Sequence, residues 1–286
     1  MASDDPSGVA AVPAPSGAVG GLVRACHPLP TAAVTLLATA LSVRAGRSGA
    51  GCALVAGAVL AGQLSVGWCN DAVDARRDAA AGRRHKPVVS GAVSSGTVRS
   101  AAVTALVLCV PLSLASGLWA TAAHLTGVGA AWAYNLRLKA GAWSWLPYAV
   151  GFGCLPAFVT LGLPGHPGPR WQPVVAAALL GVGAHLANVL PDVEDDLRAG
   201  VRGWPQRLGP AGIRLLAPVP VVAASALLVQ AMPGGPGRYG ALTVALAALV
   251  AGGGALLGRV RPRAPFLATI AVAAADVVLL FRGVGG

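Results

Sequence analysis

The sequence predicts an all-α integral membrane protein, built as a bundle of nine transmembrane helices. Two observations lead to this fold class. Hydrophobic residues make up 55% of the 286-residue chain and charged residues only 11%, and the mean hydropathy is +0.69. A soluble domain, by contrast, carries about 25% charged residues. Apolar runs of about 20 residues, the length that a helix needs to cross a bilayer, recur along the whole chain.

The apolar runs divide the chain into a short tail and one membrane domain. We expect helices at residues 20–43, 50–70, 98–117, 119–135, 142–163, 171–190, 210–232, 239–258 and 264–282. Residues 1–19 are rich in Pro, Gly and Ser and contain two acidic residues, Asp4 and Asp5. They lack the basic start of a signal peptide. We therefore expect a disordered tail at 1–19 and a transmembrane domain at 20–286.

The basic residues predict how this bundle is oriented. If the nine segments all cross the membrane, 16 of the 21 Lys and Arg residues lie on the side of the N-terminus and five on the other. Loops rich in Lys and Arg face the cytoplasm. The sequence thus predicts a multi-pass protein of the cell membrane, surrounded by the lipid bilayer, with its N-terminus in the cytoplasm. The net charge of +11 follows mostly from this bias and requires no nucleic-acid partner.

The acidic residues are concentrated in two matching blocks. Seven of the ten Asp and Glu residues lie within residues 70–78 and 188–196, and both blocks read N-x-x-x-D-x-x-x-D. On a helix, a spacing of four keeps such residues on one slowly drifting face. The aligned residues are Asn70, Asp74 and Asp78 in the first block and Asn188, Asp192 and Asp196 in the second. Both blocks fall on the predicted cytoplasmic side.

Two acidic clusters on one side of a membrane predict a cation site. Carboxylates repel one another unless cations lie between them, and Mg²⁺ commonly takes one or two carboxylates together with phosphate oxygens of a substrate. Basic residues suited to phosphate lie nearby: Arg83, Lys86, Lys139, Arg198 and Arg202. Taken alone, each of these residues could instead be one of the basic residues that orient the protein in the membrane. A diphosphate headgroup beside an apolar bundle implies a lipid tail, and the simplest such substrate is a prenyl diphosphate.

These motifs resemble the UbiA superfamily of membrane prenyltransferases. The resemblance spans roughly residues 20–282 and rests on the two acidic blocks, Tyr134 to Lys139, His85-Lys86-Pro87, Arg24 to His27-Pro28, and Arg207-Leu208-Gly209. It implies nine transmembrane helices around a lipid-accessible cavity, and Mg²⁺ as the cofactor. By match to the family motifs, the six aligned Asn and Asp residues bind Mg²⁺-diphosphate. Lys139 and Tyr134 then lie near the diphosphate and the ionising carbon.

The sequence departs from the family pattern at two places. Lys86-Pro87 stands where the family often has Arg-Pro, which is a mild change. Residues 203–206, Gly-Trp-Pro-Gln, stand where a Thr-Leu-Pro-Val-like stretch often precedes the Arg-Leu-Gly. The second departure concerns the loop that caps the site. No motif specifies an acceptor.

Residues and resemblance together predict a Mg²⁺-dependent prenyltransferase that ionises a prenyl diphosphate at the cytoplasmic side and transfers the prenyl group to an aromatic, small or lipid acceptor. The predicted catalytic residues are Asp74, Asp78, Asp192, Asp196, Lys139 and Tyr134, and the predicted diphosphate-binding residues are Asn70, Asn188, Arg83, Lys86, Arg198 and Arg202. The alternative is a membrane terpene cyclase, in which the same cation closes on itself without an acceptor. An ion-coupled transporter is a remote alternative. The acids of a transporter would lie near the bilayer midplane, whereas seven of the ten acids here cluster at predicted cytoplasmic helix ends.

Three polar residues inside apolar segments keep two interpretations each. Asp276 is either a hydrogen-bonded structural residue or part of the cavity, since an intramembrane acid is costly and often functional. His185 lies three residues before Asn188, and His124 lies in the fourth segment. For both histidines we favour a structural role within the helix over a role in binding.

Overall fold

The computed structural model describes residues 17–232 and 237–282, and within these ranges it is helical with no β-strand. The helices are α1 (Ala18–Ala25), α2 (Pro28–Arg44), α3 (Gly49–Ala80), α4 (Ser95–Leu114), α5 (Leu118–Leu136), α6 (Leu146–Leu161), α7 (Trp171–Val189), α8 (Val193–Arg198), α9 (Trp204–Leu216), α10 (Pro218–Gln230), α11 (Gly237–Leu257) and α12 (Ala264–Arg282), with 3-10 turns η1 (Leu138–Ala140) and η2 (Leu190–Asp192). The predicted all-α fold is confirmed. The predicted tail at 1–19 lies outside the described residues except for its last three, and Ala18 begins α1.

Several helices are long and apolar enough to cross a membrane. Over the described residues there are four, namely α3, α4, α11 and the stretch Trp171–Arg198, or up to six if each of two bent helix pairs counts as one span. Residues Leu146–Leu161 and Ala264–Val278 form shorter apolar helices. The protein is therefore membrane-embedded, whereas the count of nine spans stays a prediction.

The first predicted span, residues 20–43, is not one helix as predicted but is broken into α1 and α2. α1 and α2 meet at an angle of 62°. The break is at His27, whose φ of 56° is left-handed and which precedes Pro28. A residue before proline is disfavoured in the helical region, and a left-handed conformation costs a non-glycine residue about 1–2 kcal/mol. A second break, of 46°, separates α9 from α10 next to Pro218.

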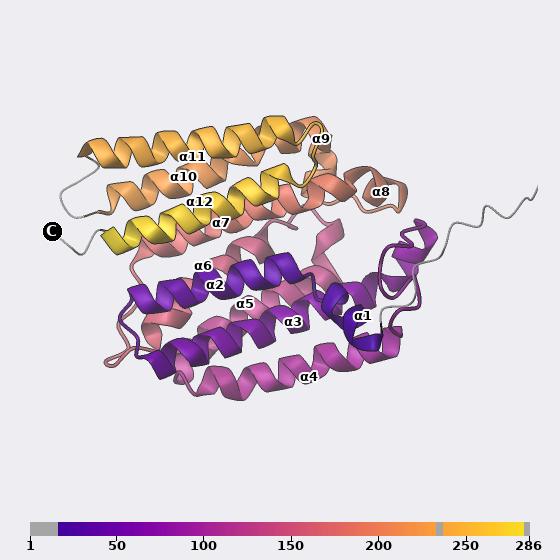
Figure 1. Ribbon diagram of the computed structural model, residues 1–286, viewed down its shortest axis with the longest axis horizontal. Coiled ribbons are helices and arrows are strands. Elements are labelled where there is room, and N and C mark those ends of the chain that lie inside the picture. The colour runs from indigo at the N-terminus through magenta and orange to yellow at the C-terminus, as the bar shows by residue number, and fades with distance from the viewer. Residues whose placement is uncertain (1–16, 233–236, 283–286) are drawn as a thin grey trace, which may run out of the picture.

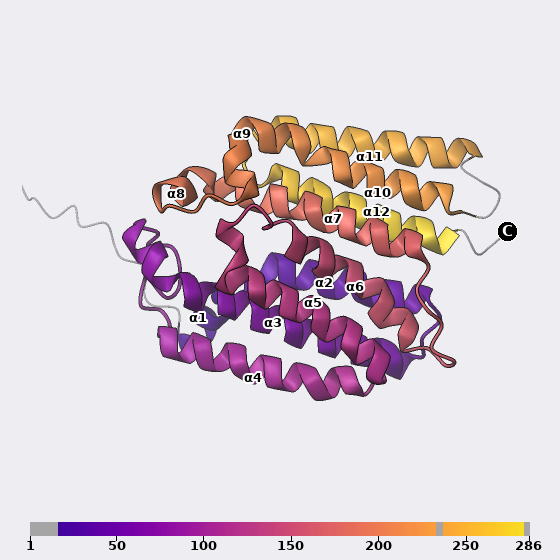
Figure 2. The same ribbon diagram turned by 180° about the vertical axis from the view of Figure 1, so that it is seen from behind.

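Six helices form a closed ring. Going around it, α2 contacts α3, α3 contacts α5, α5 contacts α6, α6 contacts α7, α7 contacts α12, and α12 returns to α2. α4 packs outside α3, and α10 and α11 pack beside α7 and α12 (Figures 1 and 2). α1, α8 and α9 lie together at one end of the bundle, which is also the end where α3 finishes (Figure 1). Both acidic blocks thus lie at this end.

Gly67 allows α3 to cross the α1–α2 break in direct contact with its backbone. A Cβ atom built at Gly67 would overlap the backbone carbonyl of Cys26. Small residues permit this kind of close approach between membrane helices. The contact brings His27 to the first acidic block, where its Nε2 lies 3.0 Å from Asp71 Oδ1. The packing of α3 therefore helps to assemble the polar end of the ring.

We expect Gly67→Ala to lower the midpoint of thermal unfolding in detergent, because the added methyl group must displace the Cys26 backbone. Overpacking of this kind costs about 1–3 kcal/mol. Gly57→Ala is the matched control in the same helix, since a Cβ there meets nothing nearer than the Leu112 side chain at 3.9 Å. It should leave the midpoint unchanged or raise it, because alanine favours a helix interior by roughly 0.5–1 kcal/mol. Equal midpoints for the two variants would contradict the close contact.

Candidate active site

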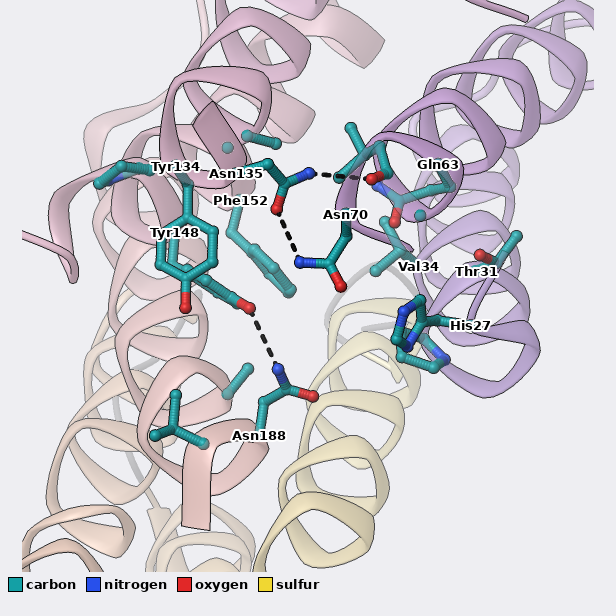
Figure 3. A pocket seen from close by; sticks show the side chains of 18 of the residues that line it. His27, Thr31, Val34, Gln63, Asn70, Tyr134, Asn135, Tyr148, Phe152 and Asn188 are labelled. Carbon is teal, nitrogen blue, oxygen red and sulfur yellow. Dashed lines mark hydrogen bonds between the residues drawn. The ribbon is translucent and has the colours of Figure 1, made fainter. Parts of the chain in front are cut away.

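A cavity of about 300 Å³ lies inside the ring of six helices. Its polar end is lined by residues that include Asn70, Asp74, Arg83, Lys86, Tyr134, Lys139, Asn188, Asp192 and Asp196. Its interior is lined mainly by apolar side chains such as Val34, Leu37, Val128, Leu155 and Ile270. In Figure 3, Asn70 from α3 and Asn188 from α7 approach the cavity from opposite sides. Nine of the twelve predicted site residues thus line one cavity.

The first acidic block occupies the last turns of α3. Asn70 and Asp74 line the cavity, and Asn70 Nδ2 donates to Asn135 Oδ1 at 3.1 Å (Figure 3). Asp78 does not line it and is 2% exposed. Each four-residue step on a helix turns the side chain by about 40° beyond a full circle, so Asp78 points about 80° away from Asn70. Because of this rotation, Asp78, the third residue of the motif, does not face the cavity.

The second block does not lie on one regular helix. Asn188 is on α7, Asp192 ends the 3-10 turn η2, and Asp196 is on α8. The motif spacing predicts one helical face, but Pro191 lacks the N–H group that a regular α-helix needs at this position. All three predicted residues nevertheless line the cavity.

Arg83 joins the two acidic blocks. Its Nη1 donates to Asp78 Oδ1 at 3.1 Å and its Nη2 to Asp196 Oδ1 at 3.3 Å. The guanidinium also lies 3.8 Å from Asp192 and 3.5 Å from Asp195. Burial lowers the pKa of Arg83, but the carboxylates of Asp192, Asp196 and Asp78 outweigh burial and raise the pKa overall. Arg83 therefore stays charged between the blocks.

Two lysines neutralise the first block. Lys139 Nζ forms an ion pair with Asp74, which also lies 3.3 Å from Arg77 Nη2. Lys86 Nζ donates to Asp71 Oδ1 at 2.8 Å. Burial lowers the pKa of the Lys139 ammonium despite the opposing attraction of Asp74. Lys139 therefore pairs with a carboxylate predicted to bind metal, whereas Lys86 pairs with Asp71, an acid that the motifs did not assign.

Besides Asp78, two predicted site residues do not line the cavity. The Arg198 side chain is 70% exposed and pairs with Asp195 at 2.6 Å, one helical turn earlier. Arg202 is exposed, and its backbone carbonyl accepts a hydrogen bond from Arg207 Nε at 2.9 Å. Neither lines the cavity. Their role in diphosphate binding stays a prediction.

The structure adds site residues that the sequence analysis did not assign. Asp71 is 2% exposed and links Lys86 to His27. Gln206 lines the cavity and donates to Asp196 Oδ2 at 2.9 Å. Asp71 is one of the clustered acids, and this clustering was a signal in the sequence that could have identified it. Gln206 lies in the segment that departs from the family pattern, so no motif indicated it.

The segment around Gln206 also packs against the turn that carries Lys139. A Cβ built at Gly203 would overlap the Lys139 carbonyl, and the Trp204 N–H lies 3.2 Å from both the Gly141 carbonyl and Ser144 Oγ. The segment after the second block therefore positions a residue that pairs with the first block.

Aromatic side chains line the cavity next to Asn188. The Tyr134 and Tyr148 rings meet edge-on with centroids 5.1 Å apart. Asn188 Nδ2 donates to the Tyr148 hydroxyl at 3.3 Å (Figure 3). His185 is 1% exposed, stacks near Tyr148 at 4.6 Å and hydrogen-bonds Ser144 through Nε2 at 3.2 Å. His185 does not line the cavity but supports Tyr148, which does.

Residues 29–280 match the UbiA prenyltransferase family. The chain belongs to this family. It is 32% identical to the bacteriochlorophyll synthase 33 kDa chain of Rhodobacter capsulatus over 177 residues, which is 55% of this chain and 56% of that protein. It is also 32% identical to the protein of the same name from Cereibacter sphaeroides over 209 residues, 67% of each chain. The matches thus span between about half and two thirds of these relatives.

Solved structures of UbiA homologues share the fold of this family member. A homologue from Aeropyrum pernix has a TM-score of 0.68 at 21% identity, covering 87% of this chain and 97% of that one. A homologue from Archaeoglobus fulgidus, solved with GPP and Mg²⁺, has a TM-score of 0.66 at 16% identity, covering 92% and 99%. The fold of this chain is therefore the UbiA fold.

The donor set of this UbiA-family protein fits Mg²⁺ that is shared with a substrate. Asn70, Asp74, Asn188, Asp192 and Asp196 offer the amide and carboxylate oxygens that hard divalent ions prefer. Among the described residues, no three His, Cys, Asp or Glu side chains gather closely enough to hold an ion by themselves. Mg²⁺ commonly takes only one or two carboxylates and completes its ligands with phosphate oxygens and water. The residues present are consistent with that arrangement.

We expect Arg83→Gln to destabilise the protein and to weaken binding of inorganic diphosphate with Mg²⁺. Removing one partner of a buried ion pair costs about 3–5 kcal/mol, and here it leaves Asp78 and Asp196 unpaired. The loss of charged hydrogen bonds to phosphate should weaken diphosphate binding roughly 10- to 100-fold.

Arg198→Gln is the comparison for this variant, because an exposed ion pair contributes only about 0.2–1 kcal/mol. Thermal midpoints and calorimetric titration with diphosphate would be measured for both variants. A larger loss in Arg198→Gln than in Arg83→Gln would contradict the bridging role and favour the assignment made from sequence.

Proposed function

We propose that this protein is a Mg²⁺-dependent prenyltransferase of the cell membrane that takes a prenyl diphosphate and transfers its prenyl group to an acceptor. The observation that carries this proposal is the shape of the cavity. One continuous space joins an end lined by carboxylates, Arg and Lys to an interior lined by Val, Leu and Ile. An amphipathic substrate with an anionic head and an apolar tail matches both parts.

The polar end would bind the diphosphate head. Asn70, Asp74, Asn188, Asp192 and Asp196 would hold Mg²⁺, which when bound would neutralise charge on the departing diphosphate. The Arg83 guanidinium would move from carboxylate to phosphate oxygens, with which it forms the same forked hydrogen bonds. The Lys139 and Lys86 ammonium groups would follow as mobile point charges. Each ion pair of the free protein would thus be exchanged for one with substrate.

The ionising carbon would lie between the polar end and the tail. The bond between C1 and the diphosphate oxygen breaks, and its electron pair leaves with the diphosphate. Tyr134 and Tyr148 would present their rings to the resulting allylic cation, which aromatic faces stabilise. The surrounding helices exclude water, which would otherwise capture the cation. The acceptor then forms a bond to C1 through a nucleophilic atom and loses its proton, unless it already arrives as an anion.

The acceptor and the orientation belong to the proposal as well. Two relatives are named bacteriochlorophyll synthase, so a bacteriochlorophyll precursor belongs in any panel of acceptors.

The two ends of the bundle differ in charge. The loops and helix ends assigned by sequence to the cytoplasmic side carry the exposed residues Arg76, Arg84, Arg259 and Arg261. Basic loops of this kind favour a cytoplasmic orientation of the site.

The function would be tested with purified protein, Mg²⁺ and prenyl diphosphates of increasing length, each with and without an acceptor mixture. Products would be identified by mass spectrometry. We expect a product with the mass of acceptor plus prenyl group, and its loss with EDTA. A cyclised hydrocarbon or alcohol formed without acceptor would instead establish the terpene cyclase.

We expect Asp74→Asn and Asp192→Asn to lower turnover by about 100-fold or more, a loss typical of removing one group that stabilises charge in a transition state. Glu194→Gln is the matched control, because Glu194 is an exposed acid of the same block that does not line the cavity. It should retain turnover. Full activity in both Asn variants, measured as diphosphate release, would refute the assignment.

A further inference from the structure

A histidine closes the end of the cavity that is farthest from the acidic blocks. Along α2, α5 and α6, the lining residues farthest from the blocks are Leu37, His124 and Leu155. Ten residues of α5 separate Tyr134 from His124, which corresponds to about 15 Å of helix. Beyond them the helices pack into an apolar core that contains Phe158, 0% exposed. The cavity therefore ends at the His124 ring.

Two neighbours hold this ring in one orientation. It stacks on Phe158 with centroids 4.4 Å apart and an interplanar angle of 10°. Its Nδ1 lies 2.8 Å from Ser113 Oγ, and that hydroxyl donates its one proton to the Cys109 carbonyl at 2.7 Å. Nδ1 must therefore be the donor to Ser113. This hydrogen-bond network leaves Nε2 as an unprotonated acceptor.

Nε2 is the polar atom of the ring that remains for the cavity. His124 is 4% exposed and lines the cavity, and Nε2 has no hydrogen-bond partner among the described residues. Gly62 of α3 lies beside the ring, since a Cβ built there would be 3.4 Å from Nε2. Covering such a lone pair with hydrocarbon is unfavourable, because its hydration is lost without replacement. The end of a mainly apolar space thus disfavours alkyl groups.

We propose that His124 sets the maximum length of the lipid tail that the cavity accepts. The inference rests on the proposed function, because it assumes a prenyl tail in the apolar interior. A tail that ends before the ring packs mainly on apolar side chains such as Val34 and Val128. A longer tail must cover Nε2 and press on a ring that Phe158 and Ser113 hold in place. His124 is thus a specificity-determining residue for the length of the donor.

The test uses prenyl S-thiolodiphosphates, in which sulfur replaces the bridging oxygen and slows ionisation. Analogues with C10, C15, C20 and C25 tails would be titrated calorimetrically into the full-length protein with Mg²⁺. His124→Ala removes both the ring and the lone pair. Gly62→Ala adds a methyl group that lies 3.4 Å from Nε2 and 3.0 Å from Cγ2 of Val128, which lines the cavity. His166→Ala is the matched control, because His166 is an exposed histidine in the loop between α6 and α7 and does not line the cavity.

In the unaltered protein, we expect affinity to fall roughly tenfold or more at the first tail that reaches the ring, as expected for burying an unpaired polar atom. In His124→Ala this step should move one five-carbon unit longer. In Gly62→Ala it should move to a shorter tail or become steeper. His166→Ala should keep the profile of the unaltered protein.

An unchanged length profile in folded His124→Ala overturns the inference. If that variant does not fold, as judged by its thermal midpoint, an unchanged profile in Gly62→Ala overturns it instead. Failure of the proposed function alone has a different signature. The unaltered protein then binds the analogues with a clear length step but forms no product from the corresponding diphosphates. Absence of binding for every analogue would overturn both proposals.

Discussion

The polar end of this membrane bundle depends on one largely buried cation between two sets of carboxylates. Arg83 lies in the loop after the first block, yet it contacts Asp78 of that block and Asp192 and Asp196 of the second. Without such a cation, acids from α3 and α8 would repel one another in a setting where water cannot screen them fully. Arg83 thus allows two acidic segments, separated along the chain by helices α4 to α7, to face one cavity.

The rest of the fold places these segments opposite one another. The close contact at Gly67 fixes α3 against the α1–α2 break, and the one at Gly203 fixes the segment after the second block against the turn of Lys139. At both positions a side chain would hold the backbones apart. The ring closes when α12 packs on α2, so the last helix supplies the cavity wall that the first helices lack. The close contacts at these glycines and the closure of the helix ring together place the two acidic blocks opposite one another.

The sequence predicted the fold class and most of the residues that line the polar end of the cavity, because composition and motif spacing indicate both. It could not predict where regular periodicity fails. Asp78 turns away from the cavity because a four-residue spacing drifts on a 3.6-residue helix, and Pro191 replaces a regular turn in the second block. Gln206 and the lone pair of His124 depend on which residues meet in space. A single sequence contains no signal for such contacts.

The resting ion pairs also constrain how substrate enters. Asp74 holds Lys139, Asp71 holds Lys86, and Arg83 is shared between the blocks, so the polar end is largely neutralised. A diphosphate entering alone would draw these cations away and leave carboxylates bare. A divalent cation entering alone would displace them with no new partner. When both enter together, carboxylates take the metal and the displaced Arg and Lys take the phosphates. Under the proposed function, metal and diphosphate therefore bind with positive coupling.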